Sequence, residues 1–127
     1  MATEFRFIFR AKDYEASVIF YRDGLELPIV HSWDQGPAQR GTVFQAASGI
    51  IEVLARAPGR ECVSLQGGEL AYEVDDVDEA YRRIQEKGLS IQGELADKPW
   101  GHRSFSVTDP DGIKVILYSI IGQAPRA

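Results

Sequence analysis

The feature that most constrains the fold of this chain is an internal repeat, because the same order of predicted elements occurs twice. Each half reads as a strand, a helix that ends at a glycine, and three further strands. Gly24 and Gly88, which we expect to end the two helices, lie 64 residues apart, and so do Glu52 and Ile116 in the last strand of each half. A half of about 50 to 60 residues buries too little surface to fold alone, so we expect one domain over 1–127.

The first module is predicted to span about 3–56. Its helix begins at Asp13, a good N-cap, and its second strand is an edge strand or begins after Pro28, which cannot donate to a sheet. Phe5, Phe7 and Phe9 alternate with Arg6, Ile8 and Arg10 in the first strand, which predicts an apolar face that a helix covers. The predicted elements are a helix at 13–23 and strands at 3–10, 25–33, 42–46 and 50–55.

The second module is predicted at about 69–121, after a glycine- and proline-rich linker at 57–68. Asp76 and Glu79 form a capping box at the start of its helix. The sequence Asp-Pro-Asp-Gly at 109–112 predicts a tight turn, because proline presets φ and glycine accepts a positive φ. The predicted strands are 69–74, 89–95, 103–108 and 114–118.

Composition excludes several classes of partner. The first 60 residues carry seven basic and seven acidic side chains and the remainder seven basic and twelve acidic, so the net charge of −5 comes from the second part. The absence of a basic stripe argues against nucleic-acid binding, and no apolar run approaches the roughly 20 residues of a membrane span. With no signal peptide and Cys62 as the only cysteine, we expect a cytoplasmic protein without an intrachain disulfide. We expect Cys62 to have no catalytic role, since no base lies beside it in the linker.

Four segments resemble, in order and spacing, the vicinal oxygen chelate superfamily of glyoxalases, bleomycin-resistance proteins and extradiol dioxygenases. They are the first helix with its Ser and Phe-Tyr pair at 13–25, Gly-Ile-Ile-Glu-Val-Leu at 49–54, the start of the second helix at 74–80, and Pro-Trp-Gly at 99–101 with the turn at 109–112. The resemblance implies an α+β fold of two tandem βαβββ modules, whose eight strands form a cupped mixed sheet with the helices on its outer face. It also implies a ligand or metal in the cup and a homodimer, in some members with modules exchanged between chains.

The resemblance also implies where a metal would bind. Metal-dependent members use His or Gln, Glu, His and Glu, one from each of four strands, and the matching positions here hold Arg6, Glu52, Glu69 and Ile116. Only Glu52 is of the expected residue type, and Glu69 is at best a substitute. The Arg6 guanidinium cannot ligate because it has no acceptor atom, and Ile116 is apolar. We therefore expect no metal cofactor, and we expect Arg6 to occupy the vacated metal position between Glu52 and Glu69.

A divalent metal held by Glu52 together with His31 and His102 is the alternative to a metal-free site. Neither histidine falls on a matching ligand position, so we expect His102 in a loop and His31 at the cup. The Gly-Gly pair at 67–68 precedes a strand and not a helix, so it does not predict a phosphate-binding loop.

Strand alternation gives a set of candidate ligand-binding residues facing the cup or its rim. Thr42, Phe44 and Ala46 are expected on the inner face of one strand, with Trp100 on a loop above the second module. Aromatic walls favour a planar ligand, whereas Glu69 and Glu73 favour a cation. For Trp33 and Trp100, packing in the core or an interface is the alternative to ligand binding. The candidates are Arg6, His31, Trp33, Phe44, Glu52, Glu69, Trp100, His102 and Tyr118.

Three functions remain open on the sequence alone. The first is a metal-independent protein, resembling bleomycin-resistance proteins, that holds a small aromatic or cationic compound. The second is a metal-dependent lyase, isomerase or dioxygenase of the same superfamily with a degenerate metal site. The third is a metal-free enzyme in which Glu52, Glu69 or His31 acts as acid or base.

Overall fold

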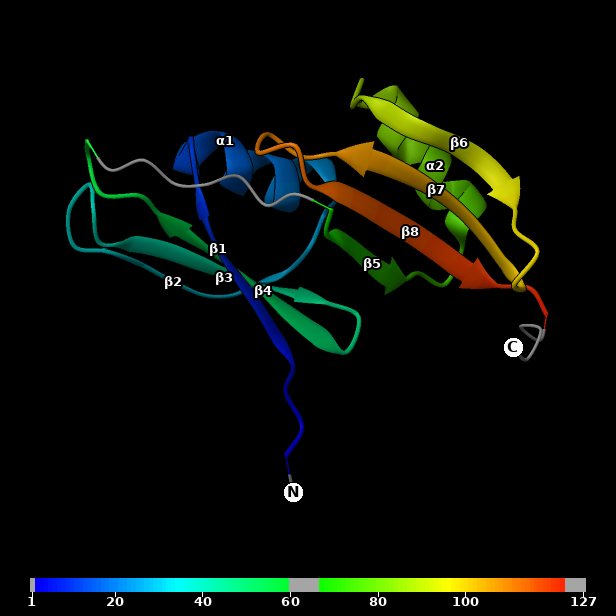
Figure 1. Ribbon diagram of the computed structural model, residues 1–127, viewed down its shortest axis with the longest axis horizontal. Helices are drawn as coiled ribbons and strands as arrows, with labels where there is room; N and C mark the ends of the chain where they lie inside the picture. The colour runs from blue at the N-terminus through cyan, green and yellow to red at the C-terminus, as the bar shows by residue number, and fades with distance from the viewer. Residues whose placement is uncertain (1, 60–66, 123–127) are drawn as a thin grey trace. The chain divides into compact units, whose positions relative to one another are not determined.

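The repeat predicted from the sequence is present in the structure. The computed structural model describes residues 2–59 and 67–122 and divides the chain into two compact units, Met1–Leu65 and Gln66–Ala127. Each unit has the element order βαβββ and contains one four-stranded mixed sheet (Figure 1). This confirms the α+β class and the tandem modules, with the eight strands divided between two sheets. Cys62 lies outside the described residues.

The first unit pairs its strands in the order β1-β4-β3-β2, with β1 and β4 parallel and the other pairs antiparallel. The strand β2 is therefore at an edge, as Pro28 predicted, and it begins directly after that proline. The elements are β1 (Arg6–Ala11), α1 (Tyr14–Ile19), the π-helical turn η1 (Phe20–Gly24), β2 (Ile29–Asp34), β3 (Arg40–Ala46) and β4 (Gly49–Ala55).

The helix of the first unit begins and ends where the sequence predicts, and its last turn is π-helical. The Asp13 carboxylate accepts a hydrogen bond from the Ala16 amide at 3.1 Å, which satisfies one free donor of the first turn. The last turn is wider than an α-helical turn, because the Leu25 amide donates to the Phe20 carbonyl at 2.9 Å. The helical segment ends at Gly24, as expected, and the residue that takes the left-handed conformation after it is Glu26, with φ 58°.

One face of the first sheet is covered by α1 and η1, and Phe44 belongs to that face. The Phe44 ring is fully buried and lies 5.9 Å from the Tyr21 ring of η1. Thr42 also faces the helix, since its hydroxyl is 2.6 Å from the Tyr14 hydroxyl. We had expected Thr42 and Phe44 on the opposite face; the prediction fails because a shift of one residue in strand phase exchanges the two faces.

The open face of the first sheet carries Trp33, whose ring lies directly on Gly41 of the neighbouring strand. A Cβ atom added at Gly41 would lie only 2.2 Å from Trp33 Cζ2. His31 stacks on the same ring, with the two centroids 5.6 Å apart. Gly41 is therefore a site of close approach, and its lack of a side chain gives the indole its place.

The second unit repeats this arrangement, with the strand order β5-β8-β7-β6 and β5 parallel to β8. The helix α2 packs against β6, β7 and β8, and Asp76 caps it by accepting from the Glu79 amide at 3.1 Å. None of the helices in the two described stretches is long and apolar enough to cross a membrane. The elements are β5 (Glu69–Glu73), α2 (Val77–Glu86), β6 (Ile91–Asp97), β7 (His102–Thr108) and β8 (Lys114–Ile120).

The turn between β7 and β8 has the structure that its sequence predicts. The Asp109 side chain accepts hydrogen bonds from the amides of Asp111 at 2.9 Å and Ile113 at 2.7 Å. Gly112 closes the turn with φ 84°, a conformation that favours glycine. This turn fixes the register of the two central strands that carry the site described below.

Removal of the Tyr72 hydroxyl is expected to leave the protein as stable or more stable. The hydroxyl is buried and has no hydrogen-bond partner among the described residues, and burial raises the pKa of Tyr72 above its usual value. Because an unsatisfied buried hydroxyl costs free energy, Tyr72→Phe should raise the free energy of unfolding by up to about 1 kcal/mol in urea titrations. In Tyr14→Phe, which loses the partner of Thr42, it should fall by about 1 kcal/mol. A loss in Tyr72→Phe as large as that in Tyr14→Phe would contradict the assignment.

Gly41→Ala should displace Trp33. The added methyl group cannot coexist with the indole in its present position, so we expect the free energy of unfolding to fall by about 1–3 kcal/mol and the tryptophan emission spectrum to change. Gly122→Ala is the control, because no atom lies within 4 Å of the methyl group that it adds. Equal stabilities and spectra for the two variants would show that Trp33 does not lie on Gly41.

Candidate functional site

The second sheet has a pocket of about 400 Å³ on the face opposite α2. The two faces are assigned by strand β7, where Phe105 packs 5.0 Å from the Tyr81 ring of α2 and Arg103 donates to Asp78 of the same helix at 2.9 Å. Ser104 and Ser106 alternate with these residues and line the pocket. Alternation along one strand thus separates helix-facing from pocket-facing side chains.

The pocket exists because small residues from three strands meet at its floor. Ala71 of β5 and Ser106 of β7 both flank Ile116 of β8, and Gly93 of β6 pairs with Ser106. A Cβ atom at Gly93 would lie 2.7 Å from Ser106 Oγ, so even one more carbon would force the hydroxyl to move. These small residues therefore leave a hollow that larger side chains would have filled.

Aromatic rings form one wall of this hollow. The rings of His102 and Tyr118 stack in parallel, with centroids 4.2 Å apart and an interplanar angle of 4°. Trp100 also lines the pocket and is 50% exposed. His102 is the first residue of β7 and not a loop residue as we had expected, and this position places its ring against Tyr118. Flat, partly exposed rings of this kind offer stacking surface to a planar ligand.

Charged groups lie around the aromatic wall. Lys114 Nζ is 3.0 Å from Glu69 Oε1, so the lysine on the pocket lining is neutralised by its neighbour on β5. Lys98 and Glu94 also line the pocket; Lys98 is half-buried, whereas Glu94 is exposed. The site therefore contains one ion pair, a half-buried lysine and an exposed glutamate.

Arg103 anchors the opposite face of the same strand to the helix. Its guanidinium contacts Asp78 at 2.9 Å and Asp97 at 2.8 Å. The hydrogen bond from Arg103 is the main reason that the pKa of Asp78 lies below its usual value, and those to Asp78 and then Asp97 raise the pKa of Arg103. These contacts tie β7 to α2 and β6 and hold the strand that supplies His102 and both serines.

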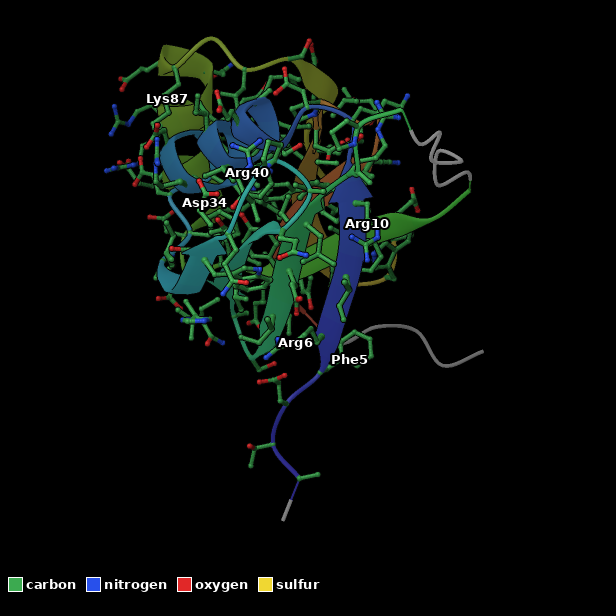
Figure 2. All side chains as sticks on the ribbon, turned by 90° about the vertical axis from the view of Figure 1, so that its left-hand side faces the viewer. Phe5, Arg6, Arg10, Asp34, Arg40 and Lys87 are labelled. Atoms are coloured by element: carbon green, nitrogen blue, oxygen red, sulfur yellow. The ribbon has the colours of Figure 1, made fainter. Side chains whose placement is uncertain are left out.

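The first unit brings together Arg6 and Glu52. Arg6 Nη1 lies 2.7 Å from Glu52 Oε1, and Arg6 Nε lies 2.7 Å from Glu4 Oε1. The hydrogen bonds to Glu4 and then Glu52 raise the pKa of Arg6, and the same contact with Arg6 lowers the pKa of Glu4. Figure 2 shows Arg6 near the start of β1 and Arg10 towards its other end. Glu52 is the more buried partner, with a side chain 13% exposed.

The strand registers of the two units make the four expected ligand positions equivalent. Arg6 pairs with Ile50, two residues before Glu52, and Glu69 pairs with Lys114, two residues before Ile116. In one unit the two ligand positions form an ion pair, Arg6 with Glu52; in the other, Glu69 pairs with Lys114, which is not itself a ligand position. Neither set fits a divalent ion, because both carboxylates are bound to cations and neither Arg6 nor Ile116 offers a ligand atom. Among residues 2–59 and 67–122, no three His, Cys, Asp or Glu side chains are arranged to hold a metal ion.

The predicted site residues fall into separate groups. Trp100, His102 and Tyr118 share the pocket of the second unit, and Glu69 borders it through Lys114. His31 and Trp33 stack together in the first unit, while Phe44 lies in the core.

Sequence reasoning missed the residues that make the pocket hollow and polar, namely Gly93, Lys98, Ser104 and Ser106. The signal for the two serines was available, because small polar residues alternate with Arg103, Phe105 and Val107 along β7. Lys98 and Gly93 gave no such signal, since they come from the turn and the bulged strand beside it.

Comparison with known proteins agrees with this architecture. The protein YraH of Bacillus subtilis (strain 168), which is uncharacterized, is 32% identical over 120 residues, covering 86% of this chain and 91% of YraH. The antibiotic binding protein TnmS3 from Streptomyces sp. CB03234 has a crystal structure that matches with a TM-score of 0.74 at 24% identity, over 94% of this chain and 97% of TnmS3. A lactoylglutathione lyase from Agrobacterium tumefaciens matches with a TM-score of 0.68 at 23% identity, over 90% of each chain.

The two solved structures are a binding protein and an enzyme, so this likeness establishes the fold and not the activity. The family profile described as Glyoxalase/Bleomycin resistance protein/Dioxygenase superfamily matches residues 5–117, which is most of the chain. With this match, the duplicated βαβββ units and the identity to YraH, the chain belongs to the glyoxalase/bleomycin resistance protein/dioxygenase superfamily.

Proposed function

We propose that this protein binds a small planar aromatic compound in the pocket of its second unit and that binding requires no metal ion. The stacked His102 and Tyr118 rings beside a hollow of about 400 Å³ are the observation that carries the proposal. A volume of this size suits a ligand of two or three fused rings, and aromatic walls supply most of the contact area in such sites. The name of TnmS3 as an antibiotic binding protein gives further support.

The lining favours an aromatic ligand over the cationic one that Glu69 and Glu73 had suggested. Glu69, the carboxylate expected to receive a cation, is held by Lys114 at 3.0 Å. Glu73 is exposed on an edge strand and does not line the pocket. A cationic ligand would therefore have to displace a lysine or rely on exposed carboxylates, whose attraction is screened by water.

Independence from metal is supported by the ion pairs of Glu52 and Glu69, which also weaken the case for either glutamate as an acid or base. Glu52 and Glu69 are the carboxylates that would serve as metal ligands or as acid and base, and each is paired with a cation within 3.0 Å. An ion pair stabilises the charged carboxylate and so weakens it as a base. The metal-dependent lyase, isomerase or dioxygenase alternative would require both ion pairs to open.

The homodimer expected from the sequence, with or without exchanged modules, is part of this proposal, as is the cytoplasmic location. Exposed apolar side chains at both edges of the first sheet, β1 and β2, support an interface between copies, since isolated soluble chains keep exposed apolar surface in small patches. They are Phe5, Ile8, Ile29 and Val30, with exposures between 43% and 77%.

Planar aromatic compounds should raise the melting temperature of the protein. A ligand at about one hundred times its Kd stabilises the folded state by about 2.7 kcal/mol, which corresponds to a rise of several degrees in a thermal-shift assay. Ala71→Trp should abolish the rise by filling the pocket from an exposed position of β5. Ala38→Trp, the same substitution at an exposed loop residue of the first unit, should preserve it. No shift with a neutral naphthalene carboxamide, acridine and a flavone in the unaltered protein, or equal shifts in both variants, would overturn the proposal.

Protein purified without chelators should contain far less than about one divalent ion per chain, the stoichiometry of a resident catalytic site. Added Zn²⁺, Ni²⁺ or Mn²⁺ should leave the thermal shift by aromatic compounds unchanged, because the positions of Arg6, Glu52, Glu69 and Ile116 do not offer a ligand set. Elemental analysis checks the first expectation and the shift assay the second. A stoichiometric ion that is lost in Glu52→Gln would favour the metal-dependent alternative.

A further inference from the structure

Two serine hydroxyls at the floor of the pocket have no partner among the described residues. Ser104 and Ser106 are 5% and 4% exposed, and neither hydroxyl has a hydrogen bond to any residue in the described parts of the chain. Their neighbours Arg103 and Phe105 face α2, so the serine side chains face the hollow. Neither hydroxyl oxygen is among the fully buried unsatisfied atoms of the described residues, so both remain accessible from the pocket. A ligand in the pocket can therefore replace water as their hydrogen-bond partner.

The hydroxyls alone do not select a ligand, because each can donate and accept. Lys98 is the residue that favours an anionic ligand. Its amide donates to the His102 carbonyl at 2.6 Å, which places Lys98 at the end of the pocket where the His102–Tyr118 wall stands. Its ammonium group has no ion-pair partner among the described residues, and an ammonium group donates but never accepts.

The other charges of the pocket do not cancel Lys98. Lys114 forms an ion pair with Glu69. Glu94 is the only carboxylate that the pocket lining itself contains within the described residues, and it is exposed, so water screens it more than it screens the half-buried Lys98. The interior polar groups of the pocket therefore offer three hydrogen-bond donors next to a flat aromatic wall.

We propose that the pocket selects planar aromatic acids, whose rings lie against the stacked His102 and Tyr118 and whose anionic oxygen accepts hydrogen bonds from Ser104, Ser106 and the Lys98 ammonium group. This inference rests on the binding function proposed above and adds the chemical class of the ligand. Hydrogen bonds to a charged acceptor are shorter and stronger than those to a neutral one, so the class follows from the donors and not from the rings.

A matched series of three probes tests the class directly: naphthalene carboxylate, its neutral carboxamide and cationic naphthylmethylamine. The three share one ring system and differ in the charge of one substituent. Isothermal titration calorimetry of the unaltered protein should give a Kd for the carboxylate about tenfold lower than for the carboxamide, a difference typical of one hydrogen bond to a charged group. The amine should bind more weakly than the carboxamide.

Variants assign the effect to the proposed donors. Lys98→Met should raise the Kd of the carboxylate about tenfold and leave that of the carboxamide nearly unchanged. Lys87→Met removes the same charge at the C-terminal end of α2, outside the pocket, and should change neither. Ser104→Ala with Ser106→Ala should weaken both probes. Gly93→Ala should weaken them too, because it forces Ser106 Oγ to rotate while keeping the serine. Urea midpoints for each variant exclude loss of folding as the cause.

The possible outcomes separate this inference from the function beneath it. Equal affinity for the three probes, or tighter binding of the amine, would overturn the acid selectivity and leave aromatic binding standing. A loss of carboxylate affinity in Lys87→Met equal to that in Lys98→Met would also overturn it, by tracing the preference to net charge. Failure of all three probes to bind would overturn the proposed function itself.

Discussion

Each sheet of this protein buries one face under its own helix, and this constraint decides which residues a ligand can reach. In the first unit Tyr21 and Phe44 close the covered face; in the second, Phe105 and Val107 do so. Because side chains of a strand alternate between faces, each buried aromatic residue fixes the direction of its neighbours. Ser104 and Ser106 face the pocket for the same reason that Phe105 faces α2.

The two units share one backbone pattern and differ in what covers the open face. Ser104 pairs with Tyr118 as Gly41 pairs with Leu54, so the two positions are equivalent. In the first unit Trp33 lies on Gly41, whereas the second unit has Ala96 at the place of Trp33. The Trp33 indole covers the first sheet at Gly41, whereas Ala96 is too small to cover Ser104 in the second sheet. A difference in side-chain size at equivalent positions thus accounts for a pocket in the second unit.

Features governed by a few neighbouring residues could be predicted from the sequence. The caps at Asp13 and Asp76 and the turn at 109–112 depend on local hydrogen bonds, and all three are confirmed. The direction of Phe44 was not predictable with the same certainty, since it depends on how β3 is aligned with its neighbours. The hollow was missed for a similar reason, because small residues on β5, β6 and β7 become a floor only when pairing places them in one row. The ion pair between Lys114 and Glu69 likewise depends on register.

Nuclear magnetic resonance with an isotope-labelled backbone tests the central claim most directly, that the open face of the second sheet is the binding surface. On titration with naphthalene carboxamide, the amide signals of Ser104, Ser106 and Tyr118 should shift with one common saturation curve. The signals of Val43 and Glu52, on the open face of the first sheet, should remain in place. Saturable shifts confined to the first sheet, with β7 and β8 unaffected, would contradict the account.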